Sequence, residues 1–517
     1  MKSMNKLKYV TGLVVLFCFM QGCYKDKGNY DYQAIGKVVI DTTVNNIRTD
    51  YAIYRNDTLR ISPDVYFNGT LVTDEKTVAD KLSFTWVIFQ ATTGGNVYSR
   101  DTLSHVIKLN EPVTKQGGKW IVHLTVKELA TQVETYVRFN VDVSETLSDG
   151  WMVLYEKDGA TDVGIIVDDR SKKGVVTPRL FLDLMKSSNG AALAGKPVAL
   201  VHSTAALTSG EVMVTSEHDM VGVDKSSFGT LYQFADLFWT PPAGQSLKAM
   251  VVNPTRKELA INNNRIHTAN YASVGTFRTN KLGPAIPGVY GELEKWSAVF
   301  YGASYDAVVY DKTNKKFKQI PVNGTSVVDF PAQATGTKFE PSNVGLDMKA
   351  DDWGASFCHY SIMSNSTNAY LLISNFYNAA PAAVGVNKID MTACPGVNAV
   401  TTLASAYAGQ YLLYGSNSNV YLYKYNSGAV AEAAWSAPAG ETVTCVRLQK
   451  FFHLAFMNAI IPLPNQVVYI ATWNEATKTG KVYSYPIDPS NGSIDKAAER
   501  VTEGYGKVKD MSYKWSL

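Results

Sequence analysis

Cysteine is scarce in this chain of 517 residues, which has five cysteines and no CxxC pair. Cys18 and Cys23 lie near the N-terminus, so the rest of the chain has only Cys358, Cys394 and Cys445. Their odd number argues against a disulfide framework, although a single disulfide stays open. We expect these three side chains to be small, buried apolar groups.

Long apolar runs and an excess of charge are also missing. After Gly22 no apolar stretch is long enough to span a bilayer, so we expect no transmembrane helix. The formal charge of +3 comes from Lys2, Lys6 and Lys8, and the chain that follows Gly22 is formally neutral. A neutral chain offers no overall attraction to nucleic acid, which is therefore not expected as a partner.

The motifs of common metal, cofactor and catalytic sites are absent. The seven histidines form no HExxH or HxH pair, and the chain has no GxSxG, Walker A or GxGxxG motif. We therefore predict no metal, no cofactor and no enzyme activity. A glycosidase pair stays open, because it requires two carboxyls about 5–9 Å apart, which sequence spacing cannot reveal. The acids closest to tryptophans in predicted loops are Glu292, Glu294, Asp351 and Asp352. The alternative is that these acids are ordinary charged side chains of loops that face solvent.

The N-terminus has the pattern of an export signal. Three lysines precede an apolar run, Val10 to Met20, of about eleven residues, which is too short for a mature membrane helix. Gly22 and Cys23 follow as in a bacterial lipobox, where the cysteine is diacylated and becomes the new N-terminus. We predict a lipoprotein signal peptide over 1–22, a membrane anchor at Cys23 and a tether over 23–35. The alternative is a plain signal peptide with a chance cysteine.

Residues 36–146 read as a small β-sandwich. Short alternating strands are separated by turn residues, and a length of about 110 residues suits an immunoglobulin-like domain. Trp86 is the predicted buried aromatic of this domain. The predicted strands are KVVID, TLRISPDVYF, LSFTWVIF, HVIKLN, KWIVHLTVKE and TYVRFNVDVS.

The stretch CYKDKGNYDY, Cys23 to Tyr32, together with this sandwich resembles the PKD-like lipoproteins of Bacteroidota. LTVKELATQVETYVRFNVDV resembles the closing hairpin of a PKD domain, and the resemblance is strongest over residues 17–145. It implies a lipid-anchored protein of the outer membrane that faces the cell exterior. Such proteins are commonly encoded beside SusC/SusD-type importers, in which a TonB-dependent barrel carries a lipoprotein lid.

A hairpin pattern recurs through residues 147–517. The seven instances start at residues 151, 211, 248, 297, 369, 410 and 466, so the mean period is about 52 residues. Such a period, with several strands in each repeat, predicts a β-propeller of about seven blades, with six or eight as alternatives. We expect KVKDMSYKW to supply a last strand that closes the ring against the first blade.

Each hairpin ends at an Asp or Asn, which we interpret as a turn device whose side chain caps backbone amides. Calcium binding is the alternative, and DPSNGSID, Asp488 to Asp495, is its best candidate, although it lacks the ligand spacing of an EF-hand loop. The seven residues are Asp168, Asp224, Asn262, Asp311, Asp390, Asn426 and Asp488.

Aromatic residues between the hairpins are the candidates for a binding face, because exposed rings stack on sugars or grip peptide side chains. The alternative is that they wedge between blades. The candidates are Trp239, Tyr290, Trp296 and Trp353.

Three Asp-Thr triplets in the first domain resemble the O-glycosylation signal of exported Bacteroidota proteins. Their threonines are Thr42, Thr58 and Thr102.

These features lead to one principal hypothesis and two alternatives. The chain is expected to be a non-catalytic accessory subunit of a SusC/SusD-type importer that captures oligopeptide or glycan, with a slight preference for oligopeptide. The first alternative is a propeller glycosidase or lyase, in which acids and aromatics converge at one end of the central channel. The second is a scaffold or adhesion protein that binds another protein.

Overall fold

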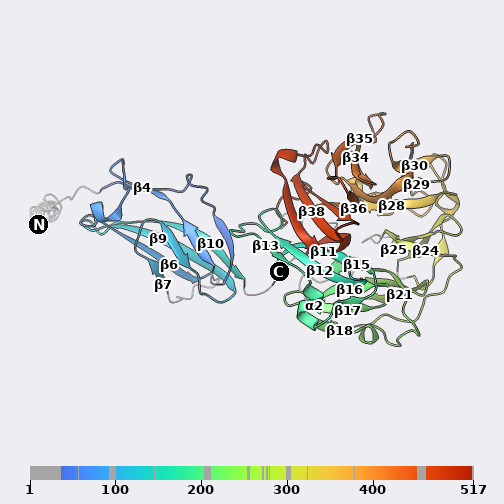
Figure 1. Cartoon of the computed structure of the whole chain (residues 1–517), viewed down its shortest axis with the longest axis horizontal. Helices are drawn as coiled ribbons and strands as arrows, with labels where there is room; N and C mark the ends of the chain where they lie inside the picture. The colour runs from blue at the N-terminus through green and yellow to red at the C-terminus, as the bar shows by residue number, and fades with distance from the viewer. Residues whose placement is uncertain are drawn as a thin grey trace, which may run out of the picture. The chain divides into compact units, whose positions relative to one another are not determined.

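The computed structural model describes residues 36–55, 57–91, 100–144, 147, 149–202, 211–252, 257–270, 273–274, 277–278, 280–298, 304–322, 324–377, 379–450 and 461–514. The predicted signal peptide, Cys23 and the tether therefore lie outside the described residues. Figure 1 shows that the described chain is all-β, with one short α-helix, α2 (Leu184–Asn189). The described chain divides into two compact units. The first comprises residues up to 49, residues 58–111 and residues 121–139, and the second comprises residues 50–57, residues 112–120 and residues from 140 onward.

The first ten strands form the N-terminal sandwich. One sheet has the order β2-β10-β9-β6-β7, and smaller sheets have the orders β1-β4-β5 and β3-β8. The bounds are β1 Val38–Asp41, β2 Asp50–Tyr54, β3 Thr58–Ile61, β4 Asp64–Phe67, β5 Thr70–Leu71, β6 Leu82–Gln90, β7 Asp101–Ser104, β8 Leu109–Pro112, β9 Gly118–Glu128 and β10 Glu134–Ser144.

Trp86 lies in the core of this sandwich, as predicted. Its side chain is fully buried, and its indole Nε1 donates to the carbonyl of Val106 at 2.9 Å. Residues of β6 alternate between buried and half-buried, as expected for a strand with one face on a core. The predicted single strand TLRISPDVYF is wrong in one respect, because it is divided into β3 and β4. DYAIY, not predicted, forms β2 and pairs in parallel with β10.

In the part of the chain described, the remaining strands form the seven blades of a β-propeller and one separate two-stranded sheet, which confirms the predicted blade number. From innermost to outermost strand, blade 1 is β40 (Lys507–Lys514), β11 (Gly150–Lys157), β12 (Ala160–Val167) and β13 (Arg179–Phe181), and β14 (Leu193–Ala194) also pairs with β12. Blade 2 is β15 (Pro197–His202), β16 (Glu211–Ser216), β17 (Met220–Asp224) and β18 (Thr230–Tyr232). Blade 3 is β19 (Leu247–Val252), β20 (Lys257–Asn262) and β21 (Arg265–Asn270), followed by a separate pair, β22 (Ser273–Val274) and β23 (Phe277–Arg278). Blade 4 is β24 (Leu293–Ala298), β25 (Tyr305–Asp311), β26 (Lys316–Pro321) and β27 (Val328–Asp329); blade 5 is β28 (Asp347–Trp353), β29 (His359–Ser364), β30 (Ala369–Ser374) and β31 (Gly385–Asp390); blade 6 is β32 (Val400–Ser405), β33 (Leu412–Ser416), β34 (Asn419–Tyr423) and β35 (Glu432–Ser436); blade 7 is β36 (Glu441–Leu448), β37 (Val467–Asn474), β38 (Thr479–Pro486) and β39 (Arg500–Tyr505).

The seven predicted hairpins fall one in each blade, but they do not occupy the same place in each. In blades 3 and 4 the predicted hairpin consists of the first and second strands of the blade, and in blade 5 it consists of the third and fourth strands. In the other blades it consists of the second and third strands. The predicted hairpins were therefore unevenly spaced, with the starts at 211 and 248 closest together and those at 297 and 369 farthest apart. The second strands of the blades start at 150, 211, 257, 305, 359, 412 and 467, which is a more even spacing.

The ring closes through β40, as predicted from KVKDMSYKW. This strand pairs with β11, with Trp151 opposite Tyr513, and it also contacts the innermost strands of blades 2 and 7. The Trp151 and Tyr469 rings stack across the seam with centroids 4.1 Å apart and 11° between their planes. Figure 1 shows the red β38 next to β11 and β12 of blade 1.

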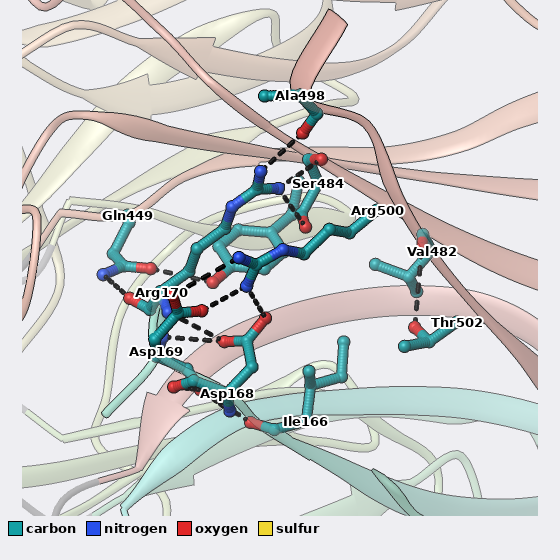
Figure 2. Close-up of polar contacts among 12 residues, drawn as sticks. Ile166, Asp168, Asp169, Arg170, Gln449, Val482, Ser484, Ala498, Arg500 and Thr502 are labelled. Atoms are coloured by element: carbon teal, nitrogen blue, oxygen red, sulfur yellow. Dashed lines mark hydrogen bonds and ion pairs between the residues drawn. The ribbon is translucent and has the colours of Figure 1, made fainter. Parts of the chain in front are cut away.

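A polar network also crosses this seam (Figure 2). Arg170 lies in the connection from β12 to β13, and its Nη1 donates to the carbonyl of Ser484 at 2.6 Å and to the Ser484 hydroxyl at 2.8 Å. Its Nη2 donates to the carbonyl of Ala498. Gln449, which follows β36, donates to the carbonyl of Arg170 at 2.7 Å and accepts from the Tyr469 hydroxyl at 2.8 Å. Blade 1 is thus bonded to blade 7 through backbone carbonyls and the Ser484 hydroxyl, in addition to the ion pairs of Arg500 with Asp168 and Asp169.

The predicted turn devices are confirmed at the five aspartates. Asp168, for example, accepts from the amides of Arg170 and Ser171 at 3.1 and 2.9 Å, and Asp488 accepts from the amide of Ser490 at 2.8 Å. The aspartates at 224, 311 and 390 cap amides two or three residues later. The two asparagines differ: Asn262 caps the amide of Ser246, and Asn426 donates to Gln410.

Candidate functional site

The propeller has two faces, and the candidate aromatics do not share one. Because all innermost strands run in the same direction, they begin at one face, here called the N-terminal face, and end at the other, the C-terminal face. Trp239 and Tyr290 precede β19 and β24, so they lie at the N-terminal face, whereas Trp353 ends β28 at the C-terminal face. Trp296 lies within β24, and its side chain is outside the described part.

The two N-terminal-face residues differ in exposure. The Trp239 side chain is 64% exposed, and its Nε1 donates to Asn280 at 3.1 Å, with the Lys281 ammonium 6.0 Å from the ring centroid. Tyr290 is half-buried and packs against the apolar cluster between blades 3 and 4, which fits the wedge alternative.

Trp353 is part of an aromatic cluster at the C-terminal face. We define this aromatic cluster as Trp353, Phe357, Tyr377 and Tyr407, all half-buried. The Tyr407 ring lies 5.8 Å from Trp353 and 5.4 Å from Phe357, and Phe357 lies 4.8 Å from Tyr377. Partly exposed rings on connections between strands supply contact area with little loss of side-chain entropy.

The backbone that presents Phe357 is strained. Ser356 and Phe357 have φ values of +56° and +55°, a left-handed conformation that ordinary residues rarely adopt. Two such residues in succession cost free energy, and strain of this kind is common where a loop is held for binding. Sequence reasoning found Trp353 but missed the other three rings, because nothing in their spacing shows that they meet.

Lys450, which follows β36, fixes one side of the aromatic cluster. Its ammonium lies 4.5 Å from the centroid of the Trp353 ring and donates to the carbonyl of Ser405 at 2.7 Å, to the carbonyl of Trp353 and to the Asp352 carboxylate. Asp352 also accepts from the amide of Ser405 at 2.8 Å. Burial lowers the pKa of Lys450, and Asp352 opposes that effect. Blades 5, 6 and 7 are therefore joined beneath the rings.

Further ion pairs link innermost strands around the ring. The Lys295 ammonium, on a side chain that is 56% exposed, lies 3.3 Å from Asp351, and Arg447 bonds Asp510 at 2.7 Å. Burial raises the pKa of Asp351, an effect that Lys295 opposes, and Asp351 raises the pKa of Lys295. Each of these carboxylates thus has a cationic partner.

One chain of side chains has the order of a hydrolase triad, but a substrate cannot reach it. It consists of Ser361, His359 and Asp351. The Ser361 hydroxyl lies 3.4 Å from His359 Nδ1, and His359 Nε2 lies 3.3 Å from Asp351. Ser361 is fully buried, so its hydroxyl cannot reach a substrate. Burial also lowers the pKa of His359 to about 3, which keeps the imidazole neutral.

The four candidate acids of a glycosidase are not brought together. Glu292 and Glu294 flank the start of β24 at the N-terminal face, where Glu292 bonds Lys248 at 2.9 Å and Glu294 lies 3.6 Å from Lys312. Asp351 and Asp352 lie near the end of β28, toward the opposite face. Among the described residues no group of three or more His, Cys, Asp or Glu could hold a metal ion.

The three glycosylation candidates lie on the sandwich. Thr102 is exposed on β7, Thr58 begins β3 half-buried, and Thr42 follows β1 half-buried. Modification at these threonines stays a prediction. Intact mass before and after chemical deglycosylation is the measurement that checks it.

A family model matches residues 23–197 of the chain. That model describes the PKD-like family. This match confirms the PKD-like resemblance and extends beyond the sandwich into blade 1 of the propeller. No curated protein matches the chain.

Solved structures similar to the chain are only distantly related. A quinonprotein alcohol dehydrogenase-like protein from Bacteroides thetaiotaomicron is 13% identical, with a TM-score of 0.41 over 91% of this chain and 98% of that one. The WD40 domain of SCAP from fission yeast is 10% identical, with a TM-score of 0.33 over 60% and 74%. The calcium-binding protein regucalcin from Agrobacterium tumefaciens is 9% identical, with a TM-score of 0.29 over 48% and 73%. These scores are low, so the propeller assignment depends on the strand order. The chain is a β-propeller protein with a PKD-like N-terminal region.

Proposed function

We propose that this chain is a surface lipoprotein of the outer membrane and a non-catalytic binding subunit of a SusC/SusD-type importer, which captures oligopeptide or glycan. The observation that carries the binding role is the aromatic cluster around Trp353. Its rings are half-buried, its loop is strained and its charged neighbours are already paired. Such a surface favours contact with a ligand over proton transfer to it.

Support for the anchor comes from the sequence. The apolar run that ends at Cys23 is the basis for lipidation at that residue, and the PKD-like match begins at the same position. Among the described residues, no helix is long and apolar enough to cross a membrane. An importer's barrel would draw on its own energy source, so a binding subunit needs no nucleotide site.

Co-purification tests this proposal. Tagged native protein is extracted in mild detergent, and all associated proteins and ligands are identified by mass spectrometry. A barrel, its lid and bound peptides or glycans are the expected result. Cys23→Ala is expected to remove the lipid mass and the membrane association. A lone monomer without ligand from the native protein would contradict the proposal.

A matched pair of variants locates the ligand. Trp353→Ala is expected to reduce the co-purified ligand while the partner proteins stay. Trp239→Ala removes an exposed tryptophan at the opposite face and is expected to change neither. Purified ligand should raise the melting temperature of the native protein and of Trp239→Ala but not of Trp353→Ala.

One observation favours the enzyme alternative. Asp351 is buried, its pKa is raised, and a raised carboxyl pKa is a property of general acids. Hydrolysis of 4-nitrophenyl glycosides by the native protein, lost in Asp351→Asn, would establish this alternative. Equal absence of hydrolysis in both proteins is expected for a binding subunit.

A further inference from the structure

A pocket of about 380 Å³ lies in the seam between blades 1 and 7, away from the aromatic cluster. Its walls are the end of β12, the edge strand β13, the middle of β38 and the edge strand β39. Figure 2 shows the residues of its polar side, among them Asp168, Ser484, Arg500 and Thr502. This volume falls within the range of sites that hold small ligands or single anchoring groups.

Fixed polar groups form one side of the pocket. Asp168 is buried, accepts from two backbone amides and accepts from Arg500 Nη1 at 3.2 Å. Arg500 also pairs with Asp169, and the Ser484 hydroxyl accepts from Arg170. These carboxylates and guanidinium groups satisfy one another, so this side presents no unpaired charge to a ligand. A charged ligand group would have to break existing bonds, which disfavours it.

The other walls are mainly aliphatic, and Arg179, which also lines them, pairs with Asp57 at 2.6 Å. Ile166, Leu180, Val482 and Val501 line them, and no aromatic ring is among the lining residues. Val501 is 38% exposed although it is apolar. Sugar sites depend largely on ring stacking and on free polar groups, and this pocket offers neither. Branched aliphatic walls instead complement a branched aliphatic group.

The two flanking strands have open edges. In the part of the chain that the structure describes, β13 and β39 are the outermost strands of their sheets, each paired on one side only. β39 is the longer, with six residues, most of them exposed. An extended peptide can add to such an edge through main-chain hydrogen bonds while a side chain fills the adjacent pocket.

We propose that the seam pocket binds a branched aliphatic side chain of an extended peptide segment whose backbone lies along β39. The proposal assigns a peptide site to the propeller that is separate from the aromatic cluster, and it does not depend on the importer assignment. Val501 belongs to the edge strand β39 beside the peptide backbone, and its side chain contacts the ligand side chain. Arg170 and Asp168 act as positioning residues for the pocket's polar side.

Fluorescence anisotropy with labelled octapeptides tests the proposal on the full chain. The probe is a Ser/Thr/Gln octapeptide with a central leucine, and its partner has serine in that position. The leucine peptide should bind roughly tenfold or more tightly, since burial of such a side chain accounts for that factor. A third peptide, with two adjacent prolines on each side of the leucine, loses main-chain donors on both edges of its strand and should bind weakly.

Two matched variants make the test specific. Val501→Lys places a charge at the pocket and should weaken the binding of the leucine peptide roughly tenfold or more. Val386→Lys changes an exposed valine on β31, the outermost strand of blade 5, and should leave affinity unchanged. Val501→Thr keeps the shape of the side chain and should give an intermediate loss, which controls for misfolding.

Three results would overturn the proposal. The first is equal affinity for the leucine and serine peptides, and the second is equal affinity in Val501→Lys and Val386→Lys. The third is binding of decanoate that depends on Val501 while the peptides do not bind, because that result assigns the pocket to an acyl chain.

Discussion

The seam between blades 7 and 1 and the seam between blades 2 and 3 are held by different interactions. At the first, β40 continues from blade 7 and pairs with β11 within blade 1, the rings of Trp151 and Tyr469 stack across the seam, and Arg170 bonds carbonyls of blade 7. The second has a buried cluster in which Arg278 bonds Glu211 at 2.7 Å and Glu258 at 2.7 Å. Burial raises the pKa of Glu211, an effect that Arg278 opposes.

This difference follows the path of the chain. Blades 2 and 3 are consecutive, so covalent continuity already places them side by side, and a buried charge cluster can be accommodated between them. Blade 7 continues directly into β40, but β11, β12 and β13 of blade 1 come from the opposite end of the propeller, so their association with β40 and with blade 7 must be favourable without that help. We infer that backbone pairing, aromatic area and carbonyl acceptors contribute most at the closing seam, where the cations of the ion pairs, Arg500 and Arg447, are partly exposed and their desolvation cost is smaller than that of the buried Arg278 cluster.

The largest expected effect is loss of the closing strand. Truncation after Gly506 removes β40, exposes the edge of β11 and opens the ring. We expect loss of cooperative unfolding and of near-ultraviolet circular dichroism from the buried aromatics. Truncation after Lys514 removes only the last three residues and should behave as the full chain does. A cooperative transition in the shorter chain would show that β40 is dispensable.

Next in size is Arg278→Leu at the other seam. It leaves Glu211 and Glu258 buried without their cation, so the free energy of unfolding should fall by about 3–5 kcal/mol. Arg265→Leu changes an exposed arginine in the same blade and should fall within about 0.5 kcal/mol of the native value. Urea unfolding measures both, and similar values for the two variants would mean that the cluster does not hold the seam.

Arg170→Ala should cost about 1–3 kcal/mol, because the carbonyls of Ser484 and Ala498 lose their donor. Arg500→Ala removes a partly exposed guanidinium from Asp169 and from the buried Asp168, which keeps its two backbone amide donors, and should cost about 1 kcal/mol. Thermal unfolding of the two variants compares them directly. If Arg500→Ala were the more destabilising, the surface ion pairs would hold the seam and the comparison above would fail.

The smallest expected effect is a pH dependence at the end of the closing strand. Lys514 is fully buried and donates to the carbonyl of Leu147 at 3.2 Å, and burial lowers its pKa to about 7. Its charged neighbours are Asp149, Asp224, Lys172 and Lys225. The unfolded chain, with an ordinary lysine pKa, binds more protons above pH 7 than the folded chain does.

Stability contributed through Lys514 should therefore rise from about pH 7 to about pH 10. The melting temperature of the native protein, relative to Lys514→Met, should increase over that window. Parallel curves for the two proteins would show that the ammonium keeps an ordinary pKa in the folded state.

The sequence predicted the propeller well because strand alternation is local. The blade number, the closing strand and the buried Trp86 all depend on short patterns or on the position of one apolar segment. The position of each hairpin within its blade was not predictable, because any two neighbouring strands of a blade form the same strand, turn and strand pattern. β2 was missed because its five residues pair in parallel with β10, far along the chain.

The candidate sites were less predictable because they depend on contacts between distant segments. Trp353 was a candidate, but its neighbours Phe357, Tyr377 and Tyr407 come from three different connections. Trp239 and Tyr290 were grouped with Trp353, although strand direction places them at the opposite face. The role of Arg170 at the seam was not predictable from any local pattern, since its acceptors lie more than 300 residues later in the chain.

The pairing of β40 with β11 also has a kinetic consequence. Trp151 cannot pair with Tyr513 until about 360 intervening residues have been synthesised, so the ring stays open during that time. Throughout that interval β11 presents an unpaired edge that can recruit the wrong strand. The nascent chain is therefore expected to be most vulnerable to misassembly and to proteases just before its final strand arrives, and a chaperone that covers β11 would be most effective at that moment.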